Sequence, residues 1–355
     1  MNASSNYTVS NKPLGAGTTT LTAWFIVTTF IEFLTSLSII LLIIAILYRH
    51  WRPSESHIQI IHMLLTSLLI TAVVNPAMTL SIYFPSVTLS LTNCRNLYVA
   101  YIICAGSEQW ASFMLSINRL IAVVFPYHYS KFNNRVVTVA AMLIGWVILL
   151  AFALPMVVGS GWDTALVPPW NICVFRPTTQ ANWEIFRISG IVGAYLPITG
   201  TLFCYLIILL SQLRLKRSKH RHRDPAEQSM HLKMKRRILI GKMLFASSLW
   251  YLACYLPHIV ITTYHFYIYV RNPHLQMWMR ALYYSGYLGT PVIFFLIGKE
   301  YRMGVKGCFH RLLRRGNALF LLQPAQRKQK GCRIRKTFKN CEQKWYIICT
   351  TTPSI

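Results

Sequence analysis

Long apolar runs, separated by shorter polar segments, dominate the chain. A helix that crosses a membrane needs roughly 20 mainly apolar residues, because the hydrocarbon core is about 30 Å thick and each residue rises 1.5 Å. Seven segments meet this requirement: about 22–47, 58–83, 96–123, 136–157, 185–212, 238–264 and 277–297. The third and the seventh are the most polar. The pattern predicts an all-α membrane protein with a seven-transmembrane helix bundle, and we see no internal repeat of the kind found in inverted-repeat transporters.

The charge distribution adds an orientation to this bundle. The 355 residues include 36 Lys and Arg but 9 Asp and Glu, so the net charge is +27. Such an excess can indicate a nucleic-acid partner. Here, however, most basic residues lie in blocks between apolar runs, in segments 48–57, 124–135, 213–237 and 298–355. Lys and Arg accumulate on the cytoplasmic side of membrane proteins. We therefore expect a multi-pass plasma-membrane protein with an extracellular N-terminus and a cytoplasmic C-terminus, and no nucleic-acid partner.

Four regions follow from this reading. We expect an extracellular N-terminus (1–21), a transmembrane domain (22–297), an amphipathic juxtamembrane helix (298–315) and a basic cytoplasmic tail (316–355). Asn2-Ala3-Ser4 and Asn6-Tyr7-Thr8 are N-x-S/T sequons, which predict glycosylation of Asn2 and Asn6. The first apolar run is too long for a signal peptide and lacks a preceding basic region, so it is expected to remain as the first span.

Recognisable landmarks occur on successive spans. Cys94 opens the third span and Asn118-Arg119-Leu120 closes it, with the arginine 25 positions after the cysteine (119 − 94). Further landmarks are Trp146, Pro197 and Tyr205, Cys254-Tyr255-Leu256-Pro257, and Thr290-Pro291-Val292-Ile293-Phe294. In this order, over about residues 20–315, the chain resembles rhodopsin-like (class A) G-protein-coupled receptors, whose motifs are D-R-Y, C-W-x-P and N-P-x-x-Y. The N-R and C-Y-L-P variants are similar to the melatonin-receptor neighbourhood and to the invertebrate trapped-in-endoderm and moody receptors.

The resemblance implies a receptor that needs no cofactor and signals to a heterotrimeric G protein. Its activation switch would comprise Asn118, Arg119, Tyr205, Tyr255, Pro257, Thr290, Pro291 and Phe294. In the family the arginine holds the cytoplasmic end closed and contacts the G protein when the sixth helix swings out. The alternative is an arginine that only anchors the helix at the membrane interface. The resemblance also makes Cys94 and Cys173, both in polar stretches of the predicted outer side, an expected disulfide between the third span and the second outer loop.

The chain departs from the family in its polar core. Ser67 replaces the aspartate of the second span and Thr290 replaces the asparagine of the seventh, so the family's sodium site is not retained. Glu108 lies 11 residues (119 − 108) before Arg119, near the third-span position of that site. We therefore expect a relocated carboxyl group, neutralised by a proton or a cation, hydrogen-bonded to Ser67 and sensitive to pH. A structural hydrogen bond without switching is the alternative.

Tyrosine and histidine residues dominate the predicted ligand pocket. Tyr101 stands where amine receptors carry an aspartate, and Tyr284 stands where opsins carry the lysine that binds retinal, so neither a cationic amine nor retinal is expected. The pocket candidates are Tyr101, His258, Tyr264, His265, Tyr283, Tyr284 and Tyr287. They suit a neutral or weakly polar ligand, such as a lipid or an indole-like molecule. The same residues could instead form an aromatic belt at the membrane interface.

The segment after the seventh span is basic and amphipathic, which predicts a short eighth helix on anionic inner-leaflet lipid. Cys308 within it is either palmitoylated or unmodified.

Two rival functions remain. The departures at Ser67, Asn118, Thr290 and Phe294 keep a non-coupling scaffold or ligand sink as the alternative to a coupling receptor. A transporter or channel is less supported, because Glu32 and Glu108 are the only acids well inside spans. We find no enzyme motif and no metal-ligand spacing.

Overall fold

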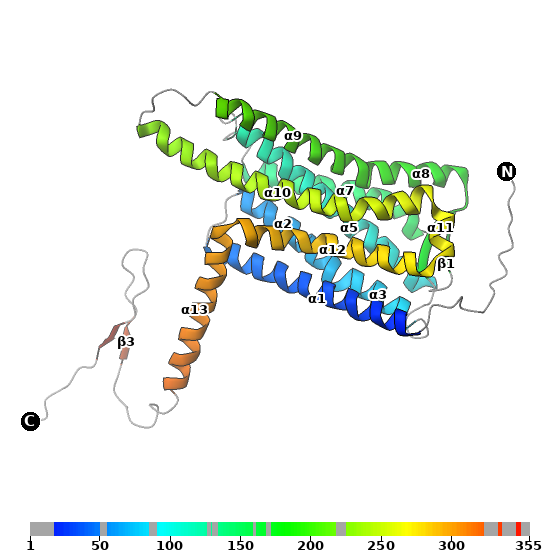
Figure 1. Cartoon of the computed structure of the whole chain (residues 1–355), viewed down its shortest axis with the longest axis horizontal. Helices are drawn as coiled ribbons and strands as arrows, with labels where there is room; N and C mark the ends of the chain where they lie inside the picture. The colour runs from blue at the N-terminus through cyan, green and yellow to red at the C-terminus, as the bar shows by residue number, and fades with distance from the viewer. Residues whose placement is uncertain are drawn as a thin grey trace, which may run out of the picture. The chain divides into compact units, whose positions relative to one another are not determined.

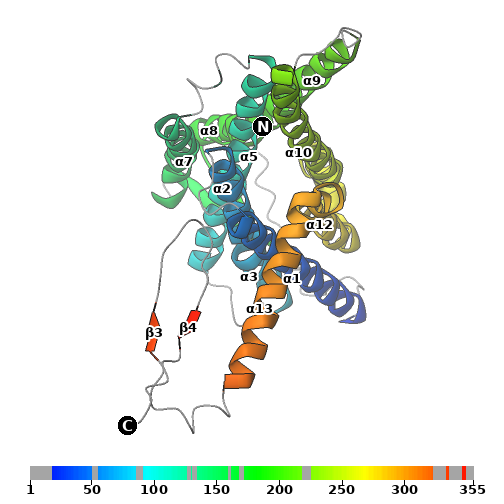
Figure 2. The same cartoon turned by 90° about the vertical axis from the view of Figure 1, so that its left-hand side faces the viewer.

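The computed structural model describes residues 18–49, 55–84, 91–125, 129, 134–158, 161–167, 172–217, 225–322, 333–335 and 346–348. Two compact units divide the chain, Met1–Val305 and Lys306–Ile355. The first unit is a bundle of long helices that lie side by side (Figures 1 and 2). Its helices are α1 (Thr18–Arg49), α2 (Glu55–Leu69), α3 (Asn75–Tyr83), α5 (Leu91–Val124), α7 (Arg135–Val158), α8 (Gln180–Gly190), α9 (Leu196–Arg217), α10 (Pro225–Tyr264), α11 (Phe266–Arg271), α12 (Pro273–Ile297) and the start of α13 (Lys299–Leu322).

This arrangement confirms the predicted seven-helix bundle. The second span is α2 and α3 joined by the π-helical turn η1 (Ile70–Val74), and the fifth is α8 and α9 joined by η2 (Ile191–Tyr195). Among the described helices, α1, α2–α3, α7, α8–α9 and α10 each contain a stretch long and apolar enough to cross a membrane, and α12 joins them if it is taken with α13, from which it is bent by 89°. The most polar predicted span, α5, packs against α2, α7, α9 and α10. Its polar residues are therefore shielded from lipid by neighbouring helices.

Prolines mark both π-helical turns. Pro76 follows η1 directly after Asn75, and Pro197 follows η2 directly after Leu196. Proline lacks a backbone N–H and clashes with the preceding turn, so a helix accommodates it by a local change in hydrogen-bond register. Pro257 and Pro291 lie inside α10 and α12 without ending either helix. The landmark residue Pro197 is therefore preceded by a π-helical turn.

The largest hydrophobic cluster of the described residues lies toward one end of the bundle. We call the end that holds the start of α1 and the hairpin described below the predicted outer end, and the end that holds Arg119 the predicted inner end. The cluster nearer the inner end includes Leu115, Ile208, Met243 and Phe294. Large apolar side chains on the outside of the bundle stay exposed, as on α7, where Val147 is 63% exposed. This inside-out distribution suits a helix that faces lipid, because the bilayer core is itself apolar.

A β-hairpin lies at the predicted outer end. Strand β1 (Trp162–Val167) pairs antiparallel with β2 (Ile172–Pro177), and Leu166 stands opposite Cys173. The hairpin packs against α5. Residue Gly161, immediately before β1, has φ of 70°, a conformation that glycine adopts without strain.

Two boundaries differ from the sequence prediction. Helix α10 begins at Pro225, although its apolar run begins near 238, because the basic segment continues the same helix beyond the apolar part. Helix α13 continues to Leu322, beyond the predicted end at 315. The second unit also contains the strands β3 (Arg333–Arg335) and β4 (Tyr346–Ile348), which pair antiparallel within the predicted tail. The apolar pattern marks neither helix boundary: the start of α10 is basic, and α13 continues through Gly316-Asn317, a pair that usually signals the end of a helix.

Candidate functional site

Tyrosine side chains from three helices meet in the outer half of the bundle. We call this group the tyrosine cluster; its members are Tyr101 on α5, Tyr251 and Tyr255 on α10, and Tyr283, Tyr284 and Tyr287 on α12. The Tyr101 hydroxyl donates a hydrogen bond to the Tyr283 hydroxyl at 3.0 Å, and the Tyr283 and Tyr287 hydroxyls are 2.5 Å apart. The last two residues meet because side chains four positions apart share one face of a helix.

The cluster, together with His258, accounts for five of the seven predicted pocket residues. His258 lies against it, with its ring centroid 5.6 Å from that of Tyr283. His265, by contrast, is exposed at the break between α10 and α11, so it does not join the cluster. The side chain of Tyr264 lies outside the described part of the chain. Sequence analysis missed Tyr251, although its position four residues before Tyr255 places both rings on one face of α10, with centroids 5.3 Å apart.

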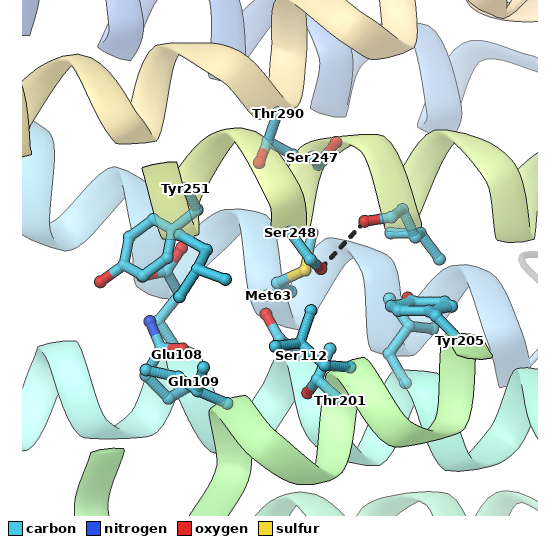
Figure 3. Close-up of a pocket in the computed structure, with 15 residues that line it drawn as sticks. Met63, Glu108, Gln109, Ser112, Thr201, Tyr205, Ser247, Ser248, Tyr251 and Thr290 are labelled. Carbon is cyan, nitrogen blue, oxygen red and sulfur yellow. Dashed lines mark hydrogen bonds between the residues drawn. The ribbon is translucent and has the colours of Figure 1, made fainter. Parts of the chain in front are cut away.

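A polar cavity of about 50 Å³ lies next to the cluster, toward the predicted inner end (Figure 3). Its polar lining comes from α5, α9, α10 and α12 and comprises Glu108, Gln109, Ser112, Thr201, Tyr205, Ser247, Ser248, Tyr251 and Thr290. About 10–15 Å³ measured in this way is enough to hold one water molecule. The cavity therefore has room for several waters or for a hydrated ion. Tyr251 belongs both to the cavity wall and to the tyrosine cluster.

Glu108 is the acidic group of this cavity and is 7% exposed. Its Oε1 lies 2.8 Å from the Ser67 hydroxyl, and the same hydroxyl lies 3.0 Å from the Met63 carbonyl oxygen. One serine hydrogen cannot serve both acceptors fully. If Glu108 carries a proton on Oε1, it donates to Ser67 and Ser67 donates to Met63, and both contacts are satisfied. The Oε2 atom makes no hydrogen bond to any residue that the structure describes.

The predicted switch residues occupy the inner half. Arg119 is 4% exposed, and Tyr205, which is also buried, interacts electrostatically with it. Next to Arg119, Asn118 donates a hydrogen bond to Gln59 on α2, with Nδ2 and Oε1 2.6 Å apart. Phe294 is fully buried, and its ring lies 5.3 Å from that of Tyr301.

The remaining switch residues lie around the cavity and along the two proline-containing helices. Thr290 lines the cavity, and Pro291 follows it within α12. Tyr255 packs on Tyr283 with ring centroids 5.4 Å apart, two residues before Pro257. The structure therefore connects these residues through α10 and α12, although it does not bring all of them into one contact.

Cys94 is buried and disulfide-bonded. The side chain of Cys173 lies outside the described part of the chain, so the pairing of these two cysteines stays a prediction. Cys308 in α13 is a free, partly exposed thiol. Asn2 and Asn6, the predicted glycosylation sites, also fall outside the described residues.

Comparison with known proteins identifies relatives. Residues 37–290 match the family model described as 7 transmembrane receptor (rhodopsin family). Over 206 residues the chain is 24% identical to galanin receptor 2b of Danio rerio, a match that covers 56% of this chain. The match covers 51% of that receptor, so the chain spans about half the length of the curated relative it matches.

Proposed function

The chain belongs to the rhodopsin family of seven-transmembrane receptors, and from this premise we propose that it transmits an extracellular ligand signal to a heterotrimeric G protein. The ligand binds among the outer halves of the helices, and the inner helix ends then move apart. Such a ligand shifts the equilibrium only if it binds the open state more tightly than the closed state. In this proposal the chain is a plasma-membrane receptor that catalyses no covalent reaction itself.

The observation that carries this proposal is the burial of Arg119. An arginine stays charged in proteins, and a buried charge is costly unless it is paired. Arg119 is 4% exposed and interacts electrostatically with Tyr205 of α9, and the adjacent Asn118 is hydrogen-bonded to Gln59 of α2. These contacts suit a closed state that holds the guanidinium inside the bundle and releases it when the inner helix ends move apart. A residue that only anchored a helix at the membrane surface would be more exposed.

The cavity and the prolines supply a means of movement. Protein interiors are close-packed, so helices that border a cavity can shift relative to one another more easily than fully packed helices. The cavity borders α10 and α12 next to Thr290, and each of these helices contains an interior proline. Proline removes a backbone hydrogen bond and so weakens the helix locally. We infer that ligand contact with the tyrosine cluster reaches the cavity through Tyr251, which is common to both.

The membrane-facing part of the proposal concerns α13. Its start turns sharply from α12, and Phe309 further along is 62% exposed. Basic residues with an exposed apolar side chain suit a helix that lies on anionic inner-leaflet lipid. Palmitoylation of the accessible thiol of Cys308 would strengthen this attachment.

A non-coupling scaffold or ligand sink is the second candidate. One observation favours it: Asn118 supplies an amide, not a carboxylate, beside Arg119, and that amide is engaged with Gln59. The arginine of this chain is therefore held by a different set of contacts from the acid–arginine pair of the family's D-R motif. The experiment below separates the two functions.

The test is constitutive signalling in cells, measured with sensors for each G-protein class at equal surface expression. We expect a basal signal from the wild type that Arg119→Ala abolishes. Arg135→Ala is the matched control, because Arg135 is an exposed arginine at the same end of the bundle. If Arg135→Ala reduces the signal as much as Arg119→Ala, a general loss of basic charge explains the effect. If the wild type activates no sensor even with the ligand-side probes described below, the scaffold function replaces the proposal.

A further inference from the structure

Arg280 is a charged residue in the outer half of α12 that the proposed switch does not use. It lies three and four residues before Tyr283 and Tyr284, so its side chain is on the same helix face as the tyrosine cluster, one turn toward the predicted outer end. Its guanidinium is within hydrogen-bonding reach of the Tyr269 hydroxyl of α11 and interacts electrostatically with Tyr284 and Tyr101. Helix α11 packs against α12 at this end of the bundle (Figure 1).

Phenol groups satisfy hydrogen bonds of a guanidinium but do not balance its charge. Among the residues that the structure describes, Arg280 makes no ion pair, whereas Arg187, another arginine of the predicted outer end, pairs with Glu184 at 3.3 Å. Glu32 of α1 is the acid that shares a neighbour, Tyr284, with Arg280. Glu32 accepts a hydrogen bond from Thr79 at 3.0 Å, and Tyr284 interacts electrostatically with both Arg280 and Glu32.

The surroundings of Arg280 are aromatic on several sides. His258 and Tyr98 both interact electrostatically with its charge. Arg280 itself is partly exposed, while Tyr269 and Tyr284 beside it are buried. The group therefore combines an accessible cation, hydroxyl donors and aromatic walls, which is the composition of a site for an anion with an apolar body.

We propose that Arg280 binds an anionic oxygen group, a carboxylate or a phosphate, of the extracellular ligand, with the Tyr269 and Tyr284 hydroxyls beside it. A guanidinium presents two parallel N–H donors that match either anion. The apolar body of the ligand then lies against His258 and the tyrosine cluster. This inference rests on the proposed receptor function, and it replaces the neutral or weakly polar ligand expected from the sequence with an anionic one.

The test measures direct binding to the full-length purified receptor in nanodiscs of phosphatidylcholine, a lipid without net charge. Three pairs of probes differ only in the anionic group: indole-3-acetate and indole-3-acetamide, oleate and oleamide, and 1-oleoylglycerol phosphate and 1-oleoylglycerol. The three anions distinguish an aromatic acid, a fatty acid and a lipid phosphate as the source of the charge. Binding is read as saturable fluorescence quenching and as the shift of the thermal unfolding midpoint.

We expect at least one anion to bind the wild type at least ten-fold more tightly than its neutral partner. Arg280→Met should remove this preference, and Arg280→Lys should retain part of it, because lysine keeps the charge but loses the two parallel donors. Arg187→Met, which removes the ion-paired arginine outside the group, should leave it unchanged.

The proposal is overturned if no anion is preferred by the wild type, or if the preference survives Arg280→Met. If Arg280→Met does not fold, the comparison of wild type with Arg280→Lys decides: equal preference in both overturns the bidentate role. Glu32→Gln tests the internal alternative. If it abolishes folding while the wild type shows no anion preference, Glu32 is the counter-charge of Arg280. None of these measurements involves a G protein. A negative binding result would therefore overturn the anion site without bearing on G-protein coupling.

Discussion

The hydrogen bond between Ser67 and Glu108 can be tested by a double-mutant cycle. Ser67→Ala removes the hydroxyl, and Glu108→Met replaces the carboxyl with an apolar group of similar length. In the wild type the two oxygens are 2.8 Å apart and buried. In the Glu108→Met variant the serine still has the Met63 carbonyl 3.0 Å away, so its loss should cost less there. The difference between the two costs is the coupling energy of the pair.

The size of this coupling reports the charge of Glu108. A hydrogen bond between neutral groups contributes about 0.5–1.5 kcal/mol to stability, and one to a charged group about 1.5–3 kcal/mol. The hydrogen count around Ser67 favours a protonated carboxyl, because Glu108 can then donate to Ser67 and Ser67 to Met63. We therefore expect a coupling energy of about 1 kcal/mol, within the neutral range.

The assay is equilibrium unfolding of the purified receptor and its three variants in mixed micelles with increasing denaturing detergent, at pH 7. Costs that add within about 0.5 kcal/mol would mean that the pair does not interact. A coupling well above about 1.5 kcal/mol would refute the neutral carboxyl and indicate an ionised one. Glu108→Gln serves as the conservative variant, because it keeps an acceptor for Ser67 and should lose less stability than Glu108→Met. The same variant tests the switching role in cells. If Glu108→Gln signals like the wild type at every pH and sodium level, Glu108 is not a switch.

Three further predictions concern other parts of the bundle. Cys94→Ala removes a disulfide, which typically contributes about 2–4 kcal/mol; we expect reduced surface expression, measured by flow cytometry, and a reductant should lower the unfolding midpoint of the wild type but not of the variant. Asn118→Ala and Gln59→Ala each remove the 2.6 Å contact between α5 and α2; basal signalling should rise in both, and no further in the double variant. Gly289→Ala forces a methyl group against a tryptophan ring of α10 and should lower the free energy of unfolding by about 1–3 kcal/mol. Gly190→Ala is the control: its methyl group meets nothing within 4 Å, so the same unfolding assay should show no loss or a slight gain in stability.

Apolar run length was enough to predict the helices of the bundle but not their ends. The run at 238–264 placed the sixth helix, while its start at Pro225 lies in a basic stretch that carries no periodic apolar signal. The end of α13 at Leu322 was missed for another reason: the helix continues through Gly316-Asn317, a pair that usually signals the end of a helix. The π-helical turns before Pro76 and Pro197 were also beyond sequence analysis, because a proline indicates a disturbance of the helix but not the form it takes.

The site was predictable where residues follow helical spacing and unpredictable where contacts join different helices. Tyr283 and Tyr287 share a face of α12 by their spacing alone. The partner of Asn118, by contrast, is Gln59 on another helix, and no local pattern connects the two. Sequence analysis did not single out Arg280, since its place among tyrosines from α5, α11 and α12 depends on how the helices pack.

The arrangement of buried ionisable groups also bears on the transporter rival. A transport path needs polar groups that line one continuous route. Glu108 lines the cavity, but Glu32 does not; it lies against Thr79 on α3, near Tyr284. Between these two acids stands the tyrosine cluster, whose rings pack closely and whose hydroxyls bond to one another. Two isolated acids separated by packed aromatic rings suit local polar contacts within a helix bundle that changes shape, and they do not form a chain of sites along which an ion could pass.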